Sequence, residues 1–275
     1  PRELYLKGKG AKRDVTKRQP HQARWTRIGD AIGGIIQRDI LDIEDNYEKM
    51  TGKQPPFRFL RTTDGYPAFE EFVKTNAPVR IADSDGELVT YNLFGLPDGI
   101  MEYTTESGEV IRVGLEIKSK QTTPARTSDY SMREAEDGHK QQCVAYSYMY
   151  NVDYYVILYV NAAKQSWFMD EDKYRKTPDI RAFAYEITDV DRYELLARFA
   201  DIQSSINNDE TPPKLDIDKW TFNNYKTACA QSLTDVEVAE LIDYKERMMS
   251  SNLKDFQKAN VAQAVDEIIK LRGGD

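Results

Sequence analysis

The sequence predicts an α/β protein in which a mixed β-sheet is flanked by helices, with extra helices at the C-terminus. Two observations lead to this fold class. Helix-like and strand-like segments follow one another as helix, several strands, helix, strand, strand and helices, which is not the regular alternation of a doubly wound sheet. The 275 residues are 40% hydrophobic and 31% charged, which is enough for a real core in an ordinary globular protein.

The first predicted helix covers roughly residues 26–50. Isoleucines recur there at helical spacing, and Gly52 provides a stop. A loop with two consecutive prolines follows, and Pro67 starts a short helix that ends near Lys74. This part of the chain therefore contributes one long helix with a buried face.

Two β-hairpins are predicted next. Residues 79–82 and 87–94 flank an Asp-Ser-Asp-Gly turn, and residues 98–103 and 109–119 flank a Glu-Ser-Gly turn. Both turn sequences are typical of chain reversals between strands. Residues 120–133 are polar and lack periodicity, so we expect a loop, long enough for a lid or a binding segment.

The second half of the chain returns to helices and single strands. A helix over 134–150 leads into residues 153–161, a nearly continuous apolar run that suits a strand covered on both faces. A strand over 181–187 and a helix over 189–206 follow. Residues 207–219 are predicted to form a linker or long loop.

The chain is therefore predicted to have three parts. They are a basic N-terminal arm (1–25), a core (26–206) and a C-terminal helical extension packed on the core (207–275). Thr234 and Glu237 form a capping-box pattern that opens the last helical stretch, which runs to about residue 271.

The net charge of -8 hides an asymmetry. Residues 1–28 hold nine basic and two acidic side chains, which makes this segment +7 and leaves -15 for the rest. A basic arm on an acidic body can neutralise phosphates. A solvated, mobile terminus has the same composition, and charge alone does not separate the two.

Other classes are excluded by composition. No stretch approaches the roughly 20 apolar residues of a membrane span, so no membrane is expected as a partner. Two cysteines cannot form a disulfide framework or a four-cysteine metal site, which favours a reducing compartment such as the cytoplasm. We expect Cys143 and Cys229 to be small buried residues.

The second hairpin carries the most informative side chains. Glu116 and Lys118 are two apart on a strand and share one face, while Ile117 points into the core. Asp98 starts the partner strand, so its carboxylate can lie beside Glu116. Two carboxylates and the Ile117 carbonyl suit Mg²⁺ or Mn²⁺ with waters retained. A lysine beside such a metal can position an attacking water or stabilise phosphoryl charge. A surface hairpin with a Glu–Lys ion pair is the alternative.

The order Pro97-Asp98, hairpin, Glu116-Ile117-Lys118 resembles the PD-(D/E)XK nuclease superfamily. The resemblance implies a restriction-endonuclease-like core, a catalytic role for Asp98, Glu116 and Lys118, and a Mg²⁺ or Mn²⁺ site formed by Asp98, Glu116 and Ile117.

A second motif resembles the RecB-like, lambda-exonuclease-like branch of that superfamily. Gln142 and Tyr146 match its Gln-x-x-x-Tyr motif, on a helix after the catalytic hairpin. The two side chains lie one turn apart on the helix, with His139 on the same face. The resemblance implies that Gln142 and Tyr146 support Lys118 and contact the DNA backbone or a terminal base.

The chain departs from that branch in two places. Gly29 is present in the first helix, but Gly33 stands where a metal-ligating histidine is expected. Either the metal is held without it, or Asp30, Asp39 or Gln37 takes part. In addition, the C-terminal cysteines that hold an iron–sulfur cluster in some relatives are missing, so no cluster is expected.

The sequence thus indicates a metal-dependent deoxyribonuclease, foremost an exonuclease in DNA recombination, repair or processing, in a bacterial or phage-infected cell. Its expected partners are linear duplex or single-stranded DNA and a single-strand annealing or binding protein. The alternatives are an endonuclease of the same superfamily and a DNA-binding module without activity. The DNA-binding candidates are Arg24, Arg27, Arg126, Arg133 and His139. Removing residues 1–24 is expected to weaken DNA binding and leave the fold intact.

Overall fold

The computed structural model describes residues 1–15, 19–163 and 167–273. The chain forms two compact units. We call one the sheet unit, made of Arg18–Arg80 and Tyr91–Leu196. We call the other the helical unit, made of Pro1–Lys17, Ile81–Thr90 and Ala197–Asp275.

A five-stranded sheet of order β1-β4-β5-β6-β7 forms the sheet unit. Its strands are β1 (Phe57–Phe59), β4 (Gly99–Thr104), β5 (Val110–Lys120), β6 (Tyr154–Asn161) and β7 (Ile180–Glu186). Neighbours are antiparallel except β5 and β6, which are parallel. A parallel pair needs a crossover, and α3 (Asp137–Tyr150) lies in that connection. The predicted mixed α/β fold is confirmed.

The long helix α2 (Pro20–Thr51) begins about six residues before the predicted start. Pro20 occupies the first turn, where its missing N–H costs nothing. Gln19 and Gln22 form a reciprocal capping box, and Gly52 ends the helix with φ +69°. The predicted helix end at Gly52 is confirmed. The predicted start was too late because a capping box of two glutamines is not a typical signal for a helix N-terminus.

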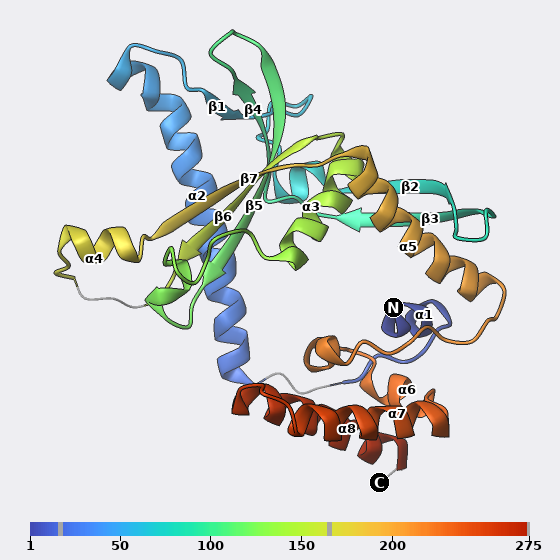
Figure 1. The fold of residues 1–275 in the computed structure, drawn as a ribbon. Coiled ribbons are helices and arrows are strands. Elements are labelled where there is room, and N and C mark those ends of the chain that lie inside the picture. The colour runs from blue at the N-terminus through green and yellow to red at the C-terminus, as the bar shows by residue number, and fades with distance from the viewer. Residues whose placement is uncertain (16–18, 164–166, 274–275) are drawn as a thin grey trace. The chain divides into compact units, whose positions relative to one another are not determined.

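The two faces of β5 are covered by different helices. Val113, Leu115 and Ile117 pack with Ile36 of α2 in one apolar core. Glu116, on the opposite face by alternation, lies on the side of α3. Figure 1 shows α2 and α3 on opposite sides of the sheet. The strand therefore presents its charged residues to α3 alone.

Both predicted hairpins are present. β2 (Thr75–Ala82) and β3 (Leu88–Gly95) form a separate two-stranded sheet, and β4 pairs with β5. Gly86 and Gly108 sit at the two turns with φ of +85° each, a conformation that glycine adopts without strain.

Two irregular segments differ from expectation. The helix expected from Pro67 is only a 3-10 turn, η1 (Glu70–Val73). The 120–133 loop contains a second such turn, η2 (Pro124–Thr127). The buried Thr127 hydroxyl donates to the carbonyl of Pro178 at 2.7 Å. The middle of this loop is therefore fastened to the body of the unit. Short α4 (Glu171–Lys176) was not predicted.

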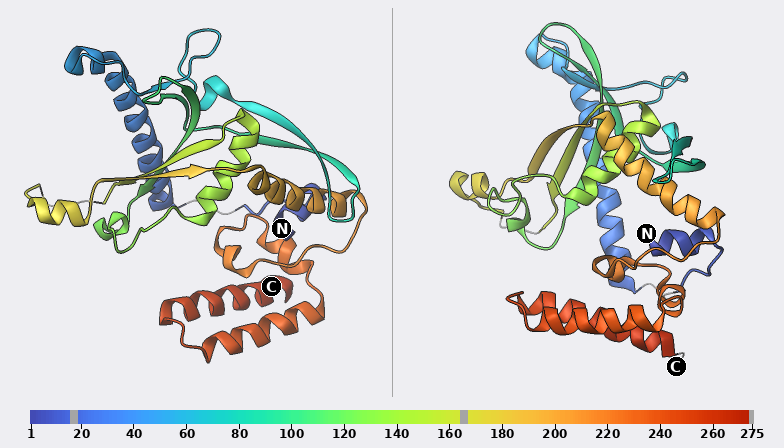
Figure 2. Two further views of the ribbon diagram at one scale, coloured as in Figure 1. Left: turned by 45° about the horizontal axis from the view of Figure 1, so that its top comes forward. Right: turned by 45° about the vertical axis from the view of Figure 1, so that its right-hand side comes forward.

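The remaining helices are α5 (Asp189–Asn207), α1 (Arg2–Gly8), η3 (Ile217–Phe222), α6 (Lys226–Gln231), α7 (Asp235–Met249) and α8 (Asp255–Gly273). The extra C-terminal helices are confirmed, and the helical stretch predicted from residue 234 to about 271 consists of α7 and α8, which are separated near residues 250–254. α7 and α8 lie side by side in both views of Figure 2. One apolar core of the helical unit includes Trp220 of η3, Cys229 of α6 and Ile268 of α8. The Thr234–Glu237 capping box is confirmed.

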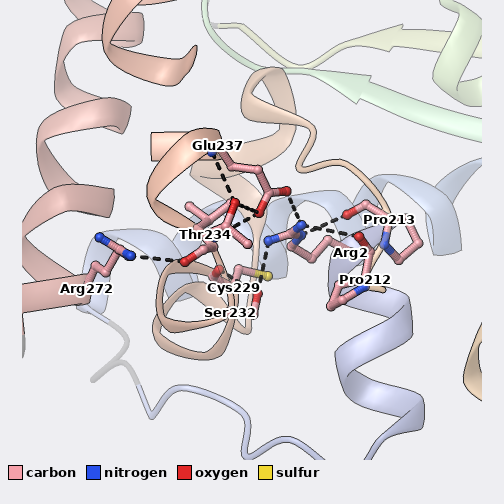
Figure 3. Close-up of polar contacts among 9 residues, drawn as sticks. Arg2, Pro212, Pro213, Cys229, Ser232, Thr234, Glu237 and Arg272 are labelled. Carbon is pink, nitrogen blue, oxygen red and sulfur yellow. Dashed lines mark hydrogen bonds and ion pairs between the residues drawn. The ribbon is translucent and has the colours of Figure 1, made fainter. Parts of the chain in front are cut away.

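The first fifteen residues differ from the expected arm. Arg2, on α1, is only 1% exposed. Its guanidinium donates to the carbonyls of Pro213 at 2.8 Å and Pro212 at 3.3 Å and to Ser232 Oγ at 3.2 Å, and pairs with Glu237 (Figure 3). These partners lie more than 200 residues away in the chain, so local composition could not reveal them. Residues 1–15 belong to the helical unit rather than to a free arm.

Both cysteines are buried and free, as predicted. In the described part of the chain, no helix is both long and apolar enough to cross a membrane.

Candidate active site

Asp98 is fixed by contacts from two other parts of the chain. Its carboxylate Oδ2 accepts the main-chain N–H of Ile117 at 2.6 Å, and its main-chain carbonyl accepts Gln37 Nε2 at 2.9 Å. The preceding carbonyl, that of Pro97, accepts the N–H of Glu70 at 2.8 Å. Asp98 thus occupies the edge of β5 just beyond the end of its pairing with β4.

The main chain of Ile117 contributes to the same edge. In a strand, the N–H and C=O of one residue point to the same side. Since the N–H of Ile117 meets Asp98, its carbonyl faces that side too. The Ile117 side chain is buried in the apolar core on the α2 face, as predicted.

Glu116 is the most unusual group of the site. Its side chain is 1% exposed. Lys118 Nζ lies in ion-pair contact with Oε1, whereas Oε2 has no partner among the described residues. A buried acceptor without a partner costs about 1–3 kcal/mol. The Oε2 atom is therefore available to a ligand.

A chain of side-chain contacts runs from Lys118 along α3. Lys118 Nζ donates to Gln142 Oε1 at 3.1 Å, and Gln142 Nε2 donates to Tyr146 Oη at 3.3 Å. The Tyr146 ring lies against Gly95, where a Cβ would come within 2.4 Å of a ring carbon. The structure therefore brings all five predicted catalytic residues together, and the glycine leaves room for the tyrosine.

The charge of Asp98 disfavours the charged form of Glu116. Burial raises the pKa of Asp98, although the Ile117 N–H and then Lys118 oppose this. Burial also raises the pKa of Glu116, and the neighbouring Asp98 raises it further, while Lys118 lowers it. A divalent cation would relieve this repulsion.

The donor set fits a hard divalent cation with an open coordination sphere. Among the described residues, no group of three or more His, Cys, Asp or Glu side chains could hold a metal. Asp98, Glu116 and the Ile117 carbonyl supply three oxygens, and Mg²⁺ normally keeps several waters beside so few protein ligands. The unpartnered Oε2 of Glu116 agrees with this assignment.

Gln37 is the one α2 candidate that reaches the site. It is buried and bonded to Asp98, whereas Asp30 and Asp39 are exposed. It lies one turn beyond Gly33, where the histidine was expected. A glutamine beside Ile36 in an apolar stripe was the available signal. Gln37 positions Asp98 through the main chain and is not placed as a ligand.

Glu70 was missed by sequence reasoning. It has φ +46°, rare for a residue other than glycine, and its charge raises the pKa of Asp98. Such outliers gather at functional sites. No motif surrounds this residue, so only the fold reveals it.

The predicted DNA-binding arginines are exposed. Arg24 and Arg27 flank Trp25 on α2, and the Trp25 carbonyl accepts Gln121 Nε2 at 3.2 Å. This part of α2 therefore lies at the end of β5 that follows Lys118. Arg126 and Arg133, on the 120–133 loop, are also exposed, and the Arg133 guanidinium lies 6.0 Å from the centre of the Tyr130 ring.

His139 lies beside Tyr159 of β6. Its Nδ1 is 2.8 Å from the hydroxyl of Tyr159. Burial, and then the charge of Lys118, lowers the pKa of His139 to about 4. It is therefore neutral at pH 7 and offers no positive charge to a phosphate. Its DNA-binding role stays a prediction.

Comparisons with known proteins do not identify the chain. No protein-family model and no curated protein matches the sequence. A solved structure titled "Crystal structure of SSO0001" is similar to it, with 13% identity and a TM-score of 0.35, covering 74% of this chain and 70% of that one. A likeness of this size carries no argument about function. The candidate site is therefore judged on its own geometry.

Proposed function

We propose that this chain is a metal-dependent deoxyribonuclease of the PD-(D/E)XK, RecB-like type, acting as an exonuclease. The observation that carries the proposal is Glu116, which is buried beside Asp98, with Oε1 in contact with the Lys118 ammonium and Oε2 without a partner among the described residues. A stabilising surface ion pair would not need a buried, unsatisfied carboxylate. The mixed sheet between α2 and α3 agrees with a restriction-endonuclease-like core.

In this proposal each side chain of the site has a separate role. Asp98, Glu116 and the Ile117 carbonyl hold Mg²⁺ or Mn²⁺, which when bound supplies Lewis-acid polarisation of the phosphate and lowers the pKa of water. Lys118 orients the attacking water and stabilises charge on the phosphate. Gln142 fixes the ammonium of Lys118.

The outer residues hold the substrate. Tyr146 is held by its hydrogen bond with Gln142. In this proposal it contacts the DNA backbone or a terminal base. Exposed Arg24, Arg27, Arg126 and Arg133 contact phosphates, which offsets the acidic body of the protein. A single-strand annealing or binding protein is the proposed partner of an exonuclease in recombination.

Cleavage assays test the proposal. Linear duplex, single-stranded and closed circular DNA, labelled at either end, are incubated with Mg²⁺, with Mn²⁺ and with EDTA. We expect metal-dependent loss of linear DNA while circles stay intact. Lys118→Ala should abolish this loss, whereas Lys173→Ala, an exposed lysine on α4, should not change it.

Other outcomes separate the alternatives. Cutting of circles would assign the site to an endonuclease. Binding of DNA without cleavage under any cation would contradict both enzyme proposals and favour a DNA-binding module.

A further inference from the structure

Two exposed aromatic rings lie on the segment that is hydrogen-bonded to the residues on either side of Asp98. Tyr66 and Phe72 stack with ring centres 4.9 Å apart and planes only 6° from parallel. They are 54% and 49% exposed. A parallel aromatic pair with this much exposed surface offers π-faces on which another flat ring can stack.

The pair is supported from beneath by the core. Phe72 meets Phe69 edge-on at 5.9 Å, and Phe69 meets the buried Phe59 edge-on at 5.1 Å. Tyr66 is held by a tight turn, in which its carbonyl accepts the N–H of Thr62 at 2.8 Å and its own N–H is bonded to the Thr62 hydroxyl at 3.2 Å. The exposed rings are therefore held in place rather than free.

The same segment is tied to the main chain on both sides of Asp98. The carbonyl of Ala68 accepts the N–H of Ile100 at 2.8 Å, and the N–H of Glu70 donates to the carbonyl of Pro97 at 2.8 Å. Tyr66 is two residues before the first contact, and Phe72 is two residues after the second. The position of the rings relative to Asp98 is thus set by hydrogen bonds on either side of it.

We propose that Tyr66 and Phe72 form a stacking platform for an unpaired nucleobase of the DNA strand held in the active site. The proposal rests on the proposed nuclease function and names a substrate contact that the catalytic motifs do not include. Stacking on aromatic side chains is sequence-tolerant, because every base has a π-face. The strained backbone at Glu70, between the rings, agrees with a segment shaped by a ligand.

The test compares two strands that differ only in their bases. Binding of a labelled thymidine oligonucleotide and of an abasic strand of equal length is measured by fluorescence anisotropy, with Ca²⁺ as the cation. We expect the natural chain to prefer the thymidine strand. The double change Tyr66→Ala and Phe72→Ala should reduce its affinity for that strand about tenfold, or about 1.4 kcal/mol, and leave affinity for the abasic strand unchanged.

Matched variants exclude loss of folding. Tyr66→Phe keeps the ring and should keep the preference. Phe168→Ala removes an aromatic side chain that is 87% exposed elsewhere in the sheet unit and should have no effect. The thermal midpoint of each variant is measured alongside.

Three outcomes would overturn the platform. They are equal affinity of the natural chain for both strands, a preference that survives the double change, and failure to bind either strand. If metal-dependent cleavage persists in the first two cases, only the platform fails. If cleavage is absent as well, the nuclease proposal fails with it.

Discussion

Each unit contains an ion pair with one buried member. In the helical unit Arg2 is buried and pairs with Glu237, and in the sheet unit Glu116 is buried and pairs with Lys118. The two buried groups differ in their other partners. Arg2 is surrounded by two carbonyls, a hydroxyl and the Glu237 carboxylate. Glu116 meets the ammonium of Lys118 at Oε1, and its Oε2 has no partner among the described residues.

This difference teaches how to separate a structural charge from a functional one. A buried charge with all its partners in the chain stabilises one arrangement of helices, and breaking it leaves an uncompensated group. A buried carboxylate with one oxygen left unpartnered costs stability, and a ligand that binds at that oxygen explains why it is kept. The comparison can be tested by changing each pair in turn.

The largest effect is expected at Glu116. Glu116→Gln should lower the initial rate of linear-duplex cleavage by about 1,000-fold or more, the scale of losing a group that stabilises transition-state charge. Its unfolding free energy in EDTA should stay equal or rise, because a buried charge is removed. A variant that cleaves at the natural rate, or that unfolds, would remove the distinction between the two pairs.

Arg2 should show the opposite pattern. Arg2→Met is expected to lower the free energy of unfolding by about 1–3 kcal/mol, because the carbonyls of Pro212 and Pro213 lose their buried donor. Urea titration followed by circular dichroism measures this. Changing Glu237→Gln together with Arg2→Met should recover part of the loss, and the cleavage rate per folded molecule should hold.

Truncation extends the same comparison. Since α1 is packed in the helical unit, removing residues 1–24 should destabilise that unit, contrary to what composition suggested. An unchanged urea midpoint after truncation would indicate that these residues form a separate arm that does not stabilise the helical unit.

Cation binding should stabilise only the natural site. At a Mg²⁺ concentration about 100 times its dissociation constant, the gain is about 2.7 kcal/mol. That raises the thermal midpoint by several degrees. The gain should vanish in Glu116→Gln and persist in Arg2→Lys. Equal shifts in both variants would place the cation elsewhere.

The smallest effect is a pH dependence in EDTA. The pKa of Glu116 is raised to about 7, chiefly by burial and then by Asp98. A raised carboxyl pKa gives stability that is fully present below the unfolded pKa and is lost as the pH rises towards 7. Unfolding by urea at pH 5 and pH 8 should therefore show a larger fall for the natural chain than for Glu116→Gln.

The sequence predicts those features that depend on residues close to one another along the chain. The Glu-Ile-Lys alternation and the one-turn spacing of Gln142 and Tyr146 fix which side chains share a face, and the structure brings them together. The same holds for the hairpins, whose turn glycines are local signals.

What it could not predict depends on distant partners. Gln37 reaches Asp98 across 61 positions, and Arg2 reaches Glu237 across 235. Glu70 carries no motif and acts through its place in the fold. Nine basic residues near the N-terminus suggested a free arm because composition does not record that one of them is buried.

The hydrogen bonds that hold Asp98 also determine at which stage of folding the candidate site forms. The bond of the Asp98 carboxylate to Ile117, 19 positions away, needs the finished hairpin, and the bond of its carbonyl to Gln37, 61 positions away, needs α2 docked on that hairpin. Contacts between distant residues form late, because loop closure must precede them. We therefore expect a nascent or partly folded chain to lack the complete arrangement of the candidate site.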